Sequence, residues 1–308
     1  MIDITLLGTS AMLPLPDRAL TSAFLSCGGH SILFDCGEGT QTAARKAGVS
    51  LMKTDLIALT HYHGDHIFGL PGLLQTMLSM GRTEPLYITG PDGLTEALGP
   101  ILTLAGPLPF EIIPAAIPGD GLELDKLIKG FKHGARLSSF ETEHRVASCG
   151  YCFTLSRPGK FLPEKAEALN VPKTMYKQLQ SGQTVEIGGA AVMPEQVLGA
   201  PRKGLKFVFS GDTAYCDTLV QAAEGADLTV FDATYAEDDQ AQLAAEHGHM
   251  DFRTAAETAA KANVKRLWLA HYSQMIKEPE EYLDKVKEIF ENVVCGRDGL
   301  SATLGFED

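Results

Sequence analysis

The stretch DLIALTHYHGDH, residues 55–66, joins an apolar run to a dense group of metal-binding side chains. Its first half has the length and composition of a buried strand. In a loop at the end of that strand, His61 and His63 can face one way while Asp65 and His66 face another, so the loop can supply ligands to two adjacent metals. A capped, solvated turn explains the pattern poorly, because three of the nine histidines fall within six residues.

Three further residues could complete such a site, and two of them, Asp212 and His271, follow apolar runs in the same way. His144 ends the segment SSFETEH, Asp212 follows KFVFSG, and His271 follows RLWLA. A single histidine at a strand end is more often structural than a ligand, so each is ambiguous alone. Together with the first motif, their order favours a dinuclear centre in which the Asp212 carboxylate bridges two ions.

Short apolar runs of strand length recur along the chain, and stretches of helix-forming composition separate only some of them. The runs with strand character are IDITLLG, SAFLSC, SILFDCG, DLIALTH, PLYITG, CGYCFTL, KFVFSGD, DLTVFDAT and RLWLAHY. The predicted helices are Thr40–Lys46, Gly69–Met80, Pro91–Leu98, Tyr215–Glu224, Asp251–Ala262 and Pro279–Phe290. The first three strands form a meander and later ones alternate with helices, which predicts an α/β fold of two mixed sheets packed face to face with helices outside.

The composition is that of a folded globular protein, with 308 residues, 44% of them hydrophobic and 21% charged. No apolar run reaches the roughly 20 residues that span a bilayer. The start MIDITLLGTS lacks the basic region of a signal peptide, so we expect a cytoplasmic protein without membrane contact. The formal net charge of -13 means that any nucleic-acid partner must bind a local basic patch.

Six cysteines in a chain of this length do not indicate a disulfide framework. Cys149 and Cys152 form a C-x-x-C pair, but they lie in the strand-like run SCGYCFTL. Without a helix N-terminus to activate a thiol or a second pair to complete a zinc site, we expect neither redox nor zinc chemistry there.

The region Arg157–Ala200 differs from the rest, because it is rich in Pro, Gly, Lys and Gln and lacks a sustained apolar period. It is expected to be an insertion that protrudes from the core. Residues 157–206 contain eight Lys or Arg residues against four Glu residues, so this segment carries a net positive charge of about four on an acidic chain.

These motifs, taken in order, resemble those of metallo-β-lactamase-fold hydrolases and, among them, the ribonuclease Z family of endonucleases that mature tRNA 3′ ends. The matching stretches are LGTSAMLPLPDRALTS, LFDCGEGTQ, THYHGDHIFGLPGLLQTM, TEHRVASCGY, VLGAPRKGLKFVFSGDT and LAHYS. The resemblance covers essentially the whole chain. It implies one αβ/βα sandwich domain over residues 1–308, with 157–200 as an inserted substrate-binding arm, and it implies a homodimer.

The resemblance also implies two zinc ions per chain, although His and Asp ligands accept manganese or iron as well. It assigns His61, His63 and His144 to one ion. It assigns Asp65, His66 and His271 to the other, with Asp212 as the bridge. The activity it implies is a zinc-dependent endoribonuclease that cleaves the 3′ trailer from precursor tRNA, by attack of a hydroxide held between the ions on the phosphodiester.

Catalytic roles follow from the same resemblance. Asp65 would orient or deprotonate the attacking water, and His249, 22 residues before His271, stands where the family has its catalytic histidine and would protonate the leaving 3′ oxygen. Glu38, in the turn after LFDCG, is expected to support the metal ligands. His247 is interpreted as a neighbour only, and His30 and His133 are interpreted as structural or surface residues.

The insertion lies where the family carries its tRNA-binding arm, and its lysines are the expected phosphate contacts. They are Lys160, Lys165, Lys173 and Lys177. Where the family usually has a Gly-Pro pair, this chain has Pro172-Lys173-Thr174-Met175.

Two alternatives stay open. One is another metallo-β-lactamase-fold hydrolase that acts on a small phosphodiester or a sulfate ester, favoured by the run His247-Gly248-His249-Met250, because the family commonly has a small hydroxyl residue after its catalytic histidine. The other is a metal-binding or RNA-binding protein without catalysis. The presence of every expected ligand argues against the second.

Overall fold

Strands from residues 2–114, together with one strand near the C-terminus, form a seven-stranded mixed sheet in the computed structural model, which describes residues 1–307. Its strands in spatial order are β16 (Ser301–Leu304), β1 (Ile2–Gly8), β2 (Ser22–Cys27), β3 (His30–Phe34), β4 (Thr54–Ala58), β5 (Leu86–Thr89) and β6 (Ile112–Pro114). The pairs from β16 to β3 are antiparallel, and those from β3 to β6 are parallel. The predicted meander at the start of the chain is therefore confirmed.

A second seven-stranded mixed sheet is built from strands between residues 122 and 295. Its strands in spatial order are β15 (Val293–Cys295), β14 (Leu267–Ala270), β13 (Leu228–Asp232), β12 (Arg202–Phe209), β9 (Cys149–Arg157), β8 (Ala135–Glu141) and β7 (Leu122–Glu123). Strands β12 to β15 run parallel, whereas β12, β9, β8 and β7 pair antiparallel. The parallel strands are separated along the chain by helices, as crossover connections require.

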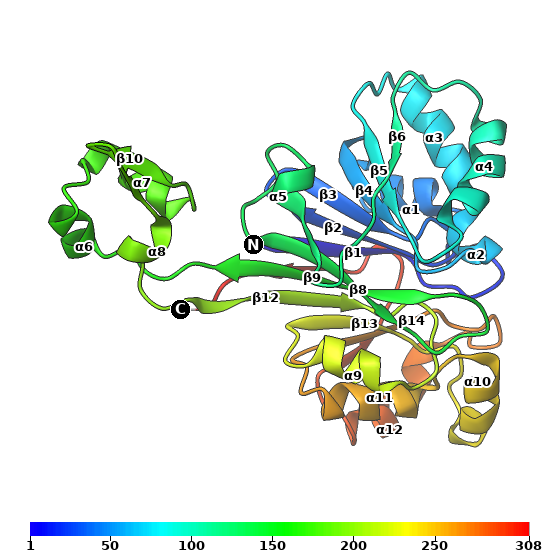
Figure 1. The fold of residues 1–308 in the computed structure, drawn as a ribbon. Helices are drawn as coiled ribbons and strands as arrows, with labels where there is room; N and C mark the ends of the chain where they lie inside the picture. The colour runs from blue at the N-terminus through cyan, green and yellow to red at the C-terminus, as the bar shows by residue number, and fades with distance from the viewer. Residues whose placement is uncertain (308) are drawn as a thin grey trace.

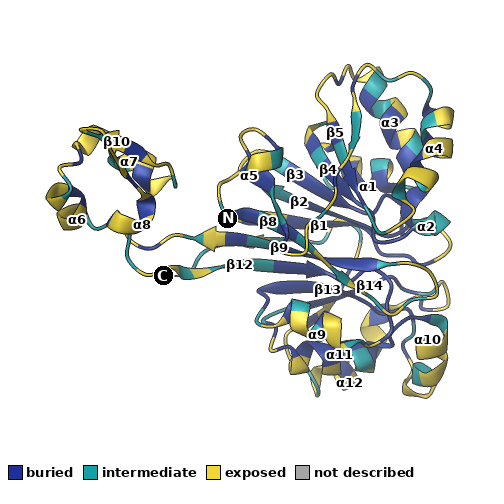
Figure 2. Ribbon diagram, viewed as in Figure 1, coloured by how far each residue is buried: buried dark blue, intermediate teal, exposed yellow. Residues whose placement is uncertain are grey.

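The two sheets pack face to face, and helices cover their outer faces (Figure 1). The first sheet carries α1 (Thr40–Lys46), α3 (Leu70–Ser79) and α4 (Leu94–Ala105), and the second carries α9 (Asp217–Ala223), α11 (Phe252–Lys261) and α12 (Leu283–Lys287). One apolar layer, including Phe34, Tyr151 and Phe207, lies between the sheets, and one lies under each helical layer. Figure 2 shows the facing strands as the most buried part of the molecule. The predicted sandwich is confirmed.

Two helix predictions need correction. The helix expected over Pro91–Leu98 begins at Leu94 and continues through Pro100 to Ala105, because Leu98, Ile101 and Ala105 on one of its faces pack into the core. The helix expected over Pro279–Phe290 is a 3-10 turn, η4 (Pro279–Tyr282), followed by the short α12. Within residues 1–307, no helix is long and apolar enough to cross a membrane.

Residues 161–198 form a separate small unit, called the arm below, at the end of the extended strands β9 and β12 (Figure 1). The arm contains α6 (Pro163–Ala168), η2 (Lys173–Met175), α7 (Tyr176–Gln180), the hairpin of β10 (Val185–Ile187) and β11 (Ala190–Val192), and α8 (Pro194–Val197). Its own core consists of Ala166, Val171, Leu179, Val185, Val192 and Val197. Each short element contributes only one or two of these residues, which explains the weak apolar periodicity.

Candidate metal centre

The predicted ligands all lie just beyond the C-terminal ends of strands, where four loops meet at one end of the sandwich. The loop after β4 carries His61 and His63 and leads into α2 (Gly64–Ile67), which contains Asp65 and His66. Loops after β8, β12 and β14 carry His144, Asp212 and His271. Strand ends of both sheets thus bring residues 61 and 271, which are far apart in sequence, to one place.

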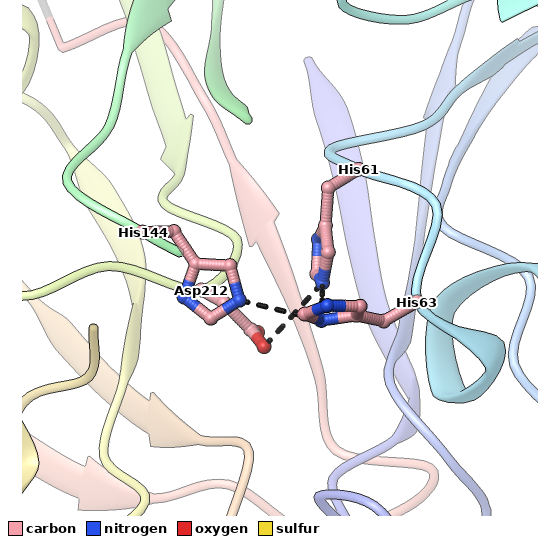
Figure 3. Close-up of side chains that lie close together, drawn as sticks. All are labelled: His61, His63, His144 and Asp212. Carbon is pink, nitrogen blue, oxygen red and sulfur yellow. Dashed lines mark hydrogen bonds and ion pairs between the residues drawn. The ribbon is translucent and has the colours of Figure 1, made fainter. Parts of the chain in front are cut away.

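One group of side chains consists of His61, His63, His144 and Asp212, and their ligand atoms all lie within 4.8 Å of one another. Nε2 of His61 is 2.9 Å from Nδ1 of His63, which is 3.3 Å from Nε2 of His144. Oδ2 of Asp212 lies 3.7 Å from Nε2 of His61. Figure 3 shows the four side chains pointing toward one another from both sheets.

A second group consists of Asp65, His66 and His271. Oδ2 of Asp65 lies 3.7 Å from Nε2 of His66 and 3.5 Å from Nε2 of His271. Oδ1 of Asp212 is 3.2 Å from both of these histidine nitrogens. The two carboxylate oxygens of Asp212 therefore face the two groups, which is the placement that a bridging ligand requires.

The donor atoms of this cluster suit cations. His66 Nε2, His271 Nε2 and Asp212 Oδ1 are buried and have no hydrogen-bond partner within the described chain. Unpaired polar atoms are costly to bury, and three that converge on one point are explained by a cation between them. Nitrogen donors from histidine together with aspartate oxygens are the usual ligands of zinc in hydrolases.

The pKa shifts point the same way. Burial lowers the pKa of His61, His63 and His144, which leaves these imidazoles neutral and able to donate a lone pair. Burial opposes ionisation of Asp212, but the neighbouring His271 and His66 hold its pKa well below its usual range. The centre therefore presents carboxylates together with three neutral imidazoles. Burial also opposes protonation of His66 and His271, but the charge of Asp212 raises the pKa of both, so a metal ion bound there must displace a proton from each ring.

Outer hydrogen bonds orient the ligand histidines. Nδ1 of His66 lies 2.7 Å from Oδ2 of Asp35, and Nδ1 of His144 lies 2.8 Å from the carbonyl oxygen of Gly248. Nδ1 of His271 lies 2.8 Å from the hydroxyl of Thr234. When Nδ1 donates to such partners, Nε2 is left unprotonated and faces the centre.

Asp35 is a functional residue that the sequence analysis missed. It is fully buried, and besides His66 it accepts hydrogen bonds from the backbone N–H and the hydroxyl of Thr60. The expectation that Glu38 supports the ligands is wrong, because Glu38 is exposed at the turn surface and Asp35 occupies the supporting position. Asp35 directly follows the apolar strand β3, the same pattern that singled out Asp212.

Three residues around the centre adopt a left-handed backbone conformation that residues other than glycine rarely take. They are Met12, Asp35 and His271, with φ of 61°, 54° and 64°. Each such residue costs about 1–3 kcal/mol, which the surrounding contacts must offset. Met12 is held by a hydrogen bond from its backbone N–H to Oδ2 of Asp65, at 2.8 Å.

His249 lies against the second group, and Asp232 holds it there. Its Nδ1 is 2.7 Å from Oδ2 of Asp232 and 4.0 Å from Oδ2 of Asp212, and its ring stacks on His271 with centroids 5.3 Å apart. Burial opposes protonation of His249, yet the Asp232 carboxylate raises its pKa overall. Asp232, another residue missed from the sequence, also follows an apolar strand.

The remaining histidines lie outside the cluster. His247 has Nδ1 2.7 Å from the Tyr235 hydroxyl, and His133 has Nδ1 2.7 Å from Asp125. His30 stacks on Phe131 and lies 3.2 Å from Asp55.

Cys149 and Cys152 face opposite sides of β9. Cys149 belongs to the core between the sheets, whereas Cys152 belongs to the layer under the outer helices. Burial raises the pKa of the Cys149 thiol to about 12. The two thiols therefore cannot share a metal ion or form a disulfide with each other.

Two mixed sheets with outer helices, and a His/Asp cluster at one end of the sandwich, define a metal-dependent hydrolase of the metallo-β-lactamase fold. Residues 165–272 match the model of the beta-lactamase superfamily domain, and residues 2–98 match that of the anti-Pycsar protein Apyc1. Proteins called ribonuclease Z from Agathobacter rectalis and Clostridioides difficile are 41% and 37% identical to this chain, and each alignment covers all of both proteins. The chain belongs to the ribonuclease Z family.

Solved structures agree with this assignment. Human tRNase Z, short form, superposes with a TM-score of 0.67 at 28% identity, covering 99% of this chain and 100% of the human one. The metallo-beta-lactamase fold protein YhfI from Bacillus subtilis has a TM-score of 0.69 at 19% identity and covers 98% of both chains. The second likeness concerns the fold alone.

Proposed function

We propose that this protein is a zinc-dependent endoribonuclease that removes the 3′ trailer from precursor tRNA. The observation that carries the proposal is the convergence of all seven expected ligands, with His249 beside them, in a chain of the ribonuclease Z family. His61, His63 and His144 would hold one ion, Asp65, His66 and His271 would hold the other, and Asp212 would bridge. Manganese or iron would suit the same donors.

Two divalent ions, when bound, supply a water of lowered pKa and neutralise charge on the phosphate. Asp65 would orient that water. Burial acts to raise the pKa of the Asp65 carboxyl, but the neighbouring His271 and His66 hold that pKa well below its usual range. An Asp65 carboxylate that stays ionised is a weak base, so orienting the water suits it better than taking its proton.

His249 would donate a proton to the leaving 3′ oxygen. Its Nδ1 is engaged by Asp232, so Nε2 is the nitrogen that can serve the substrate. Asp232 stabilises the protonated ring and thereby keeps the acid form populated near neutral pH. The products would be a tRNA with a 3′-hydroxyl and a trailer with a 5′-phosphate.

The arm is the proposed tRNA-binding element, and its lysines are exposed as that role requires. It leaves the sheet at the end of β12 opposite Asp212, and the eight residues of β12, at about 3.3 Å each, separate the two by about 25 Å. A ligand that contacts both must span about 25 Å, which the body of a precursor tRNA can do and a small ester cannot. A homodimer and a cytoplasmic location stay predictions.

The positive charge lies at the base of the arm more than in the arm itself. Residues 161–198 contain three lysines, at 165, 173 and 177, against four glutamates. The excess over residues 157–206 therefore comes from the neck, called so below: Arg157, Lys160, Arg202, Lys203 and Lys206. Lys203 and Lys206 also lie beside acidic or carbonyl partners, at Asp227 and Glu224.

The rival activity, hydrolysis of a small phosphodiester or sulfate ester, loses part of its support. It was favoured by Met250 after His249, but the Met250 side chain is only 1% exposed and packs under the outer helices. Met250 therefore does not shape the substrate site.

The test is to incubate the purified protein with a 3′-extended precursor tRNA and, separately, with bis(p-nitrophenyl) phosphate. Cleavage of the RNA directly after the unpaired nucleotide that follows the acceptor stem supports the proposal. His30→Ala serves as the histidine control, because His30 begins β3 at the end of the strand opposite Asp35 and the ligand loops. Hydrolysis of the small ester without RNA cleavage would refute the tRNA assignment.

A further inference from the structure

Several exposed apolar side chains gather around the metal centre. Met12, Phe68, Val146 and Met275 are 71%, 69%, 42% and 81% exposed. Phe68 and Val146 lie two residues after His66 and His144, Met275 lies four residues after His271, and Met12 hydrogen-bonds Asp65. Isolated exposed apolar residues are ordinary, but their gathering on the loops of one site indicates a ligand with apolar faces.

Phe68 is the aromatic member of this group, and its ring lies on the metal-binding loop itself. A Cβ placed on Gly64 would lie 2.4 Å from Cε2 of Phe68, so the ring rests directly on the backbone between His63 and Asp65. The backbone N–H of Phe68 donates to the carbonyl oxygen of Gly64, at 2.9 Å. One side of the ring is thus supported by the loop while most of its surface stays open.

The backbone beside Phe68 is also fixed. The N–H of Gly69 donates to the carbonyl oxygen of Cys36 at 2.8 Å, and a Cβ on Gly69 would lie 2.1 Å from the carbonyl oxygen of Gly37. Only glycine permits this close approach. Phe68 is therefore an aromatic surface held in place before any ligand binds, which reduces the entropy lost on binding.

We propose that Phe68 is a stacking platform for a nucleobase that flanks the scissile phosphate. This inference rests on the proposed ribonuclease function. When an unpaired RNA segment places its scissile phosphate at the metal centre, the two nucleobases that flank this phosphate lose their stacking on each other. Proteins commonly bind such unstacked bases on aromatic rings. Stacking tolerates any base, and it needs no positive charge on an acidic protein.

The test compares Phe68→Leu with the unchanged enzyme on precursor tRNAs that are intact or abasic at one of the two nucleotides flanking the cleavage site. Loss of one stacked base corresponds to roughly a tenfold fall in kcat/KM, within a range of about 5- to 150-fold. We expect Phe68→Leu and one abasic substitution each to cause this loss, and the two together to cause no more than either alone. Phe68→Trp should keep full activity, and Leu104→Ala, at a side chain 75% exposed on α4, is the matched control.

Losses that multiply would show that Phe68 does not contact that base, and would overturn the proposal. If the Phe68→Leu variant binds less metal than the unchanged enzyme, the variant is set aside and only the unchanged enzyme is compared on the three substrates. Equal cleavage of the intact and both abasic precursor tRNAs would then refute stacking. Failure of the unchanged enzyme to cut any precursor tRNA refutes the proposed function instead. The abasic position that gives the loss identifies whether the base belongs to the tRNA or to the trailer.

Discussion

The carboxylate of Asp232 and the imidazole of His249 form a buried pair, with Oδ2 of Asp232 2.7 Å from Nδ1 of His249. Asp232→Asn should lower kcat on precursor tRNA about 10- to 100-fold, because the ring loses the partner that orients and charges it. Burial lowers the pKa of His249, whereas Asp232 raises it. Without the Asp232 carboxylate, His249 should lose its proton at a lower pH, so the alkaline limb of the rate–pH profile should shift to lower pH. A rate–pH profile that is scaled down without moving would contradict this role.

His249→Ala should keep both metals and lose turnover by roughly 10²- to 10⁴-fold, the usual contribution of a positioned acid. His247→Ala is the matched control, since His247 bonds Tyr235 outside the cluster and should lose little. Metal content and single-turnover rates measure the two effects separately. Full loss in His247→Ala with little loss in His249→Ala would reverse the assignment.

Asp212→Ala should disturb both metal positions together, because its two oxygens face both groups of ligands. His144→Ala should weaken mainly the position formed with His61 and His63. Metal analysis after gel filtration should give about two ions per chain in the parent. Retention of one full equivalent in Asp212→Ala would argue against a bridge.

Asp298 should make the unfolding free energy depend on pH. Burial raises its pKa to about 6, although Thr9 and Ala19 donate hydrogen bonds to it. A carboxyl with a raised folded pKa stabilises below its unfolded value, near 4, and this stabilisation is lost as the pH rises through 6. The asparagine of Asp298→Asn cannot ionise, so the unfolding free energy of this variant minus that of the parent should rise by up to about 3 kcal/mol between pH 4 and pH 7 when both are unfolded in urea. A constant difference across that range would contradict the shift.

The arm lysines and the neck can be tested against each other. Changing the arm lysines Lys165, Lys173 and Lys177 to Gln should weaken precursor tRNA processing, flatten its salt dependence and spare bis(p-nitrophenyl) phosphate. Deleting only residues 159–180 is a poorer test, because it removes half of the arm's core. The matched variant neutralises Arg202, Lys203 and Lys206. If only this second set changes tRNA processing, the recognition surface is the neck.

The sandwich and the metal ligands could be predicted because both depend on local patterns. His61, Asp212 and His271 follow apolar runs, as Asp212 follows KFVFSG, and strand ends of a sandwich converge. The short strands β7 and β16, with two and four residues, have too little pattern to be recognised alone. Asp35 and Asp232 have the right pattern, but their role as supports of histidines depends on contacts across the fold.

The charge on the arm could not be placed from sequence for a different reason. A count over residues 157–206 does not tell which lysines lie on the arm and which on strand β12. In the fold, residues 157–206 are divided between the arm and the neck, and only the neck carries a net positive charge.

The pairing of β1 with β16 joins Ile2 to Leu304. Asp298, just before β16, accepts the N–H of Ala19 and so fastens the loop in which Met12 reaches Asp65. During synthesis, β1 can pair with β2 at once, but its other edge stays unpaired until β16 is made almost three hundred residues later. A chain that ends before residue 298 would contain every metal ligand but would lack the hydrogen bond that holds Ala19 in the loop leading from Met12.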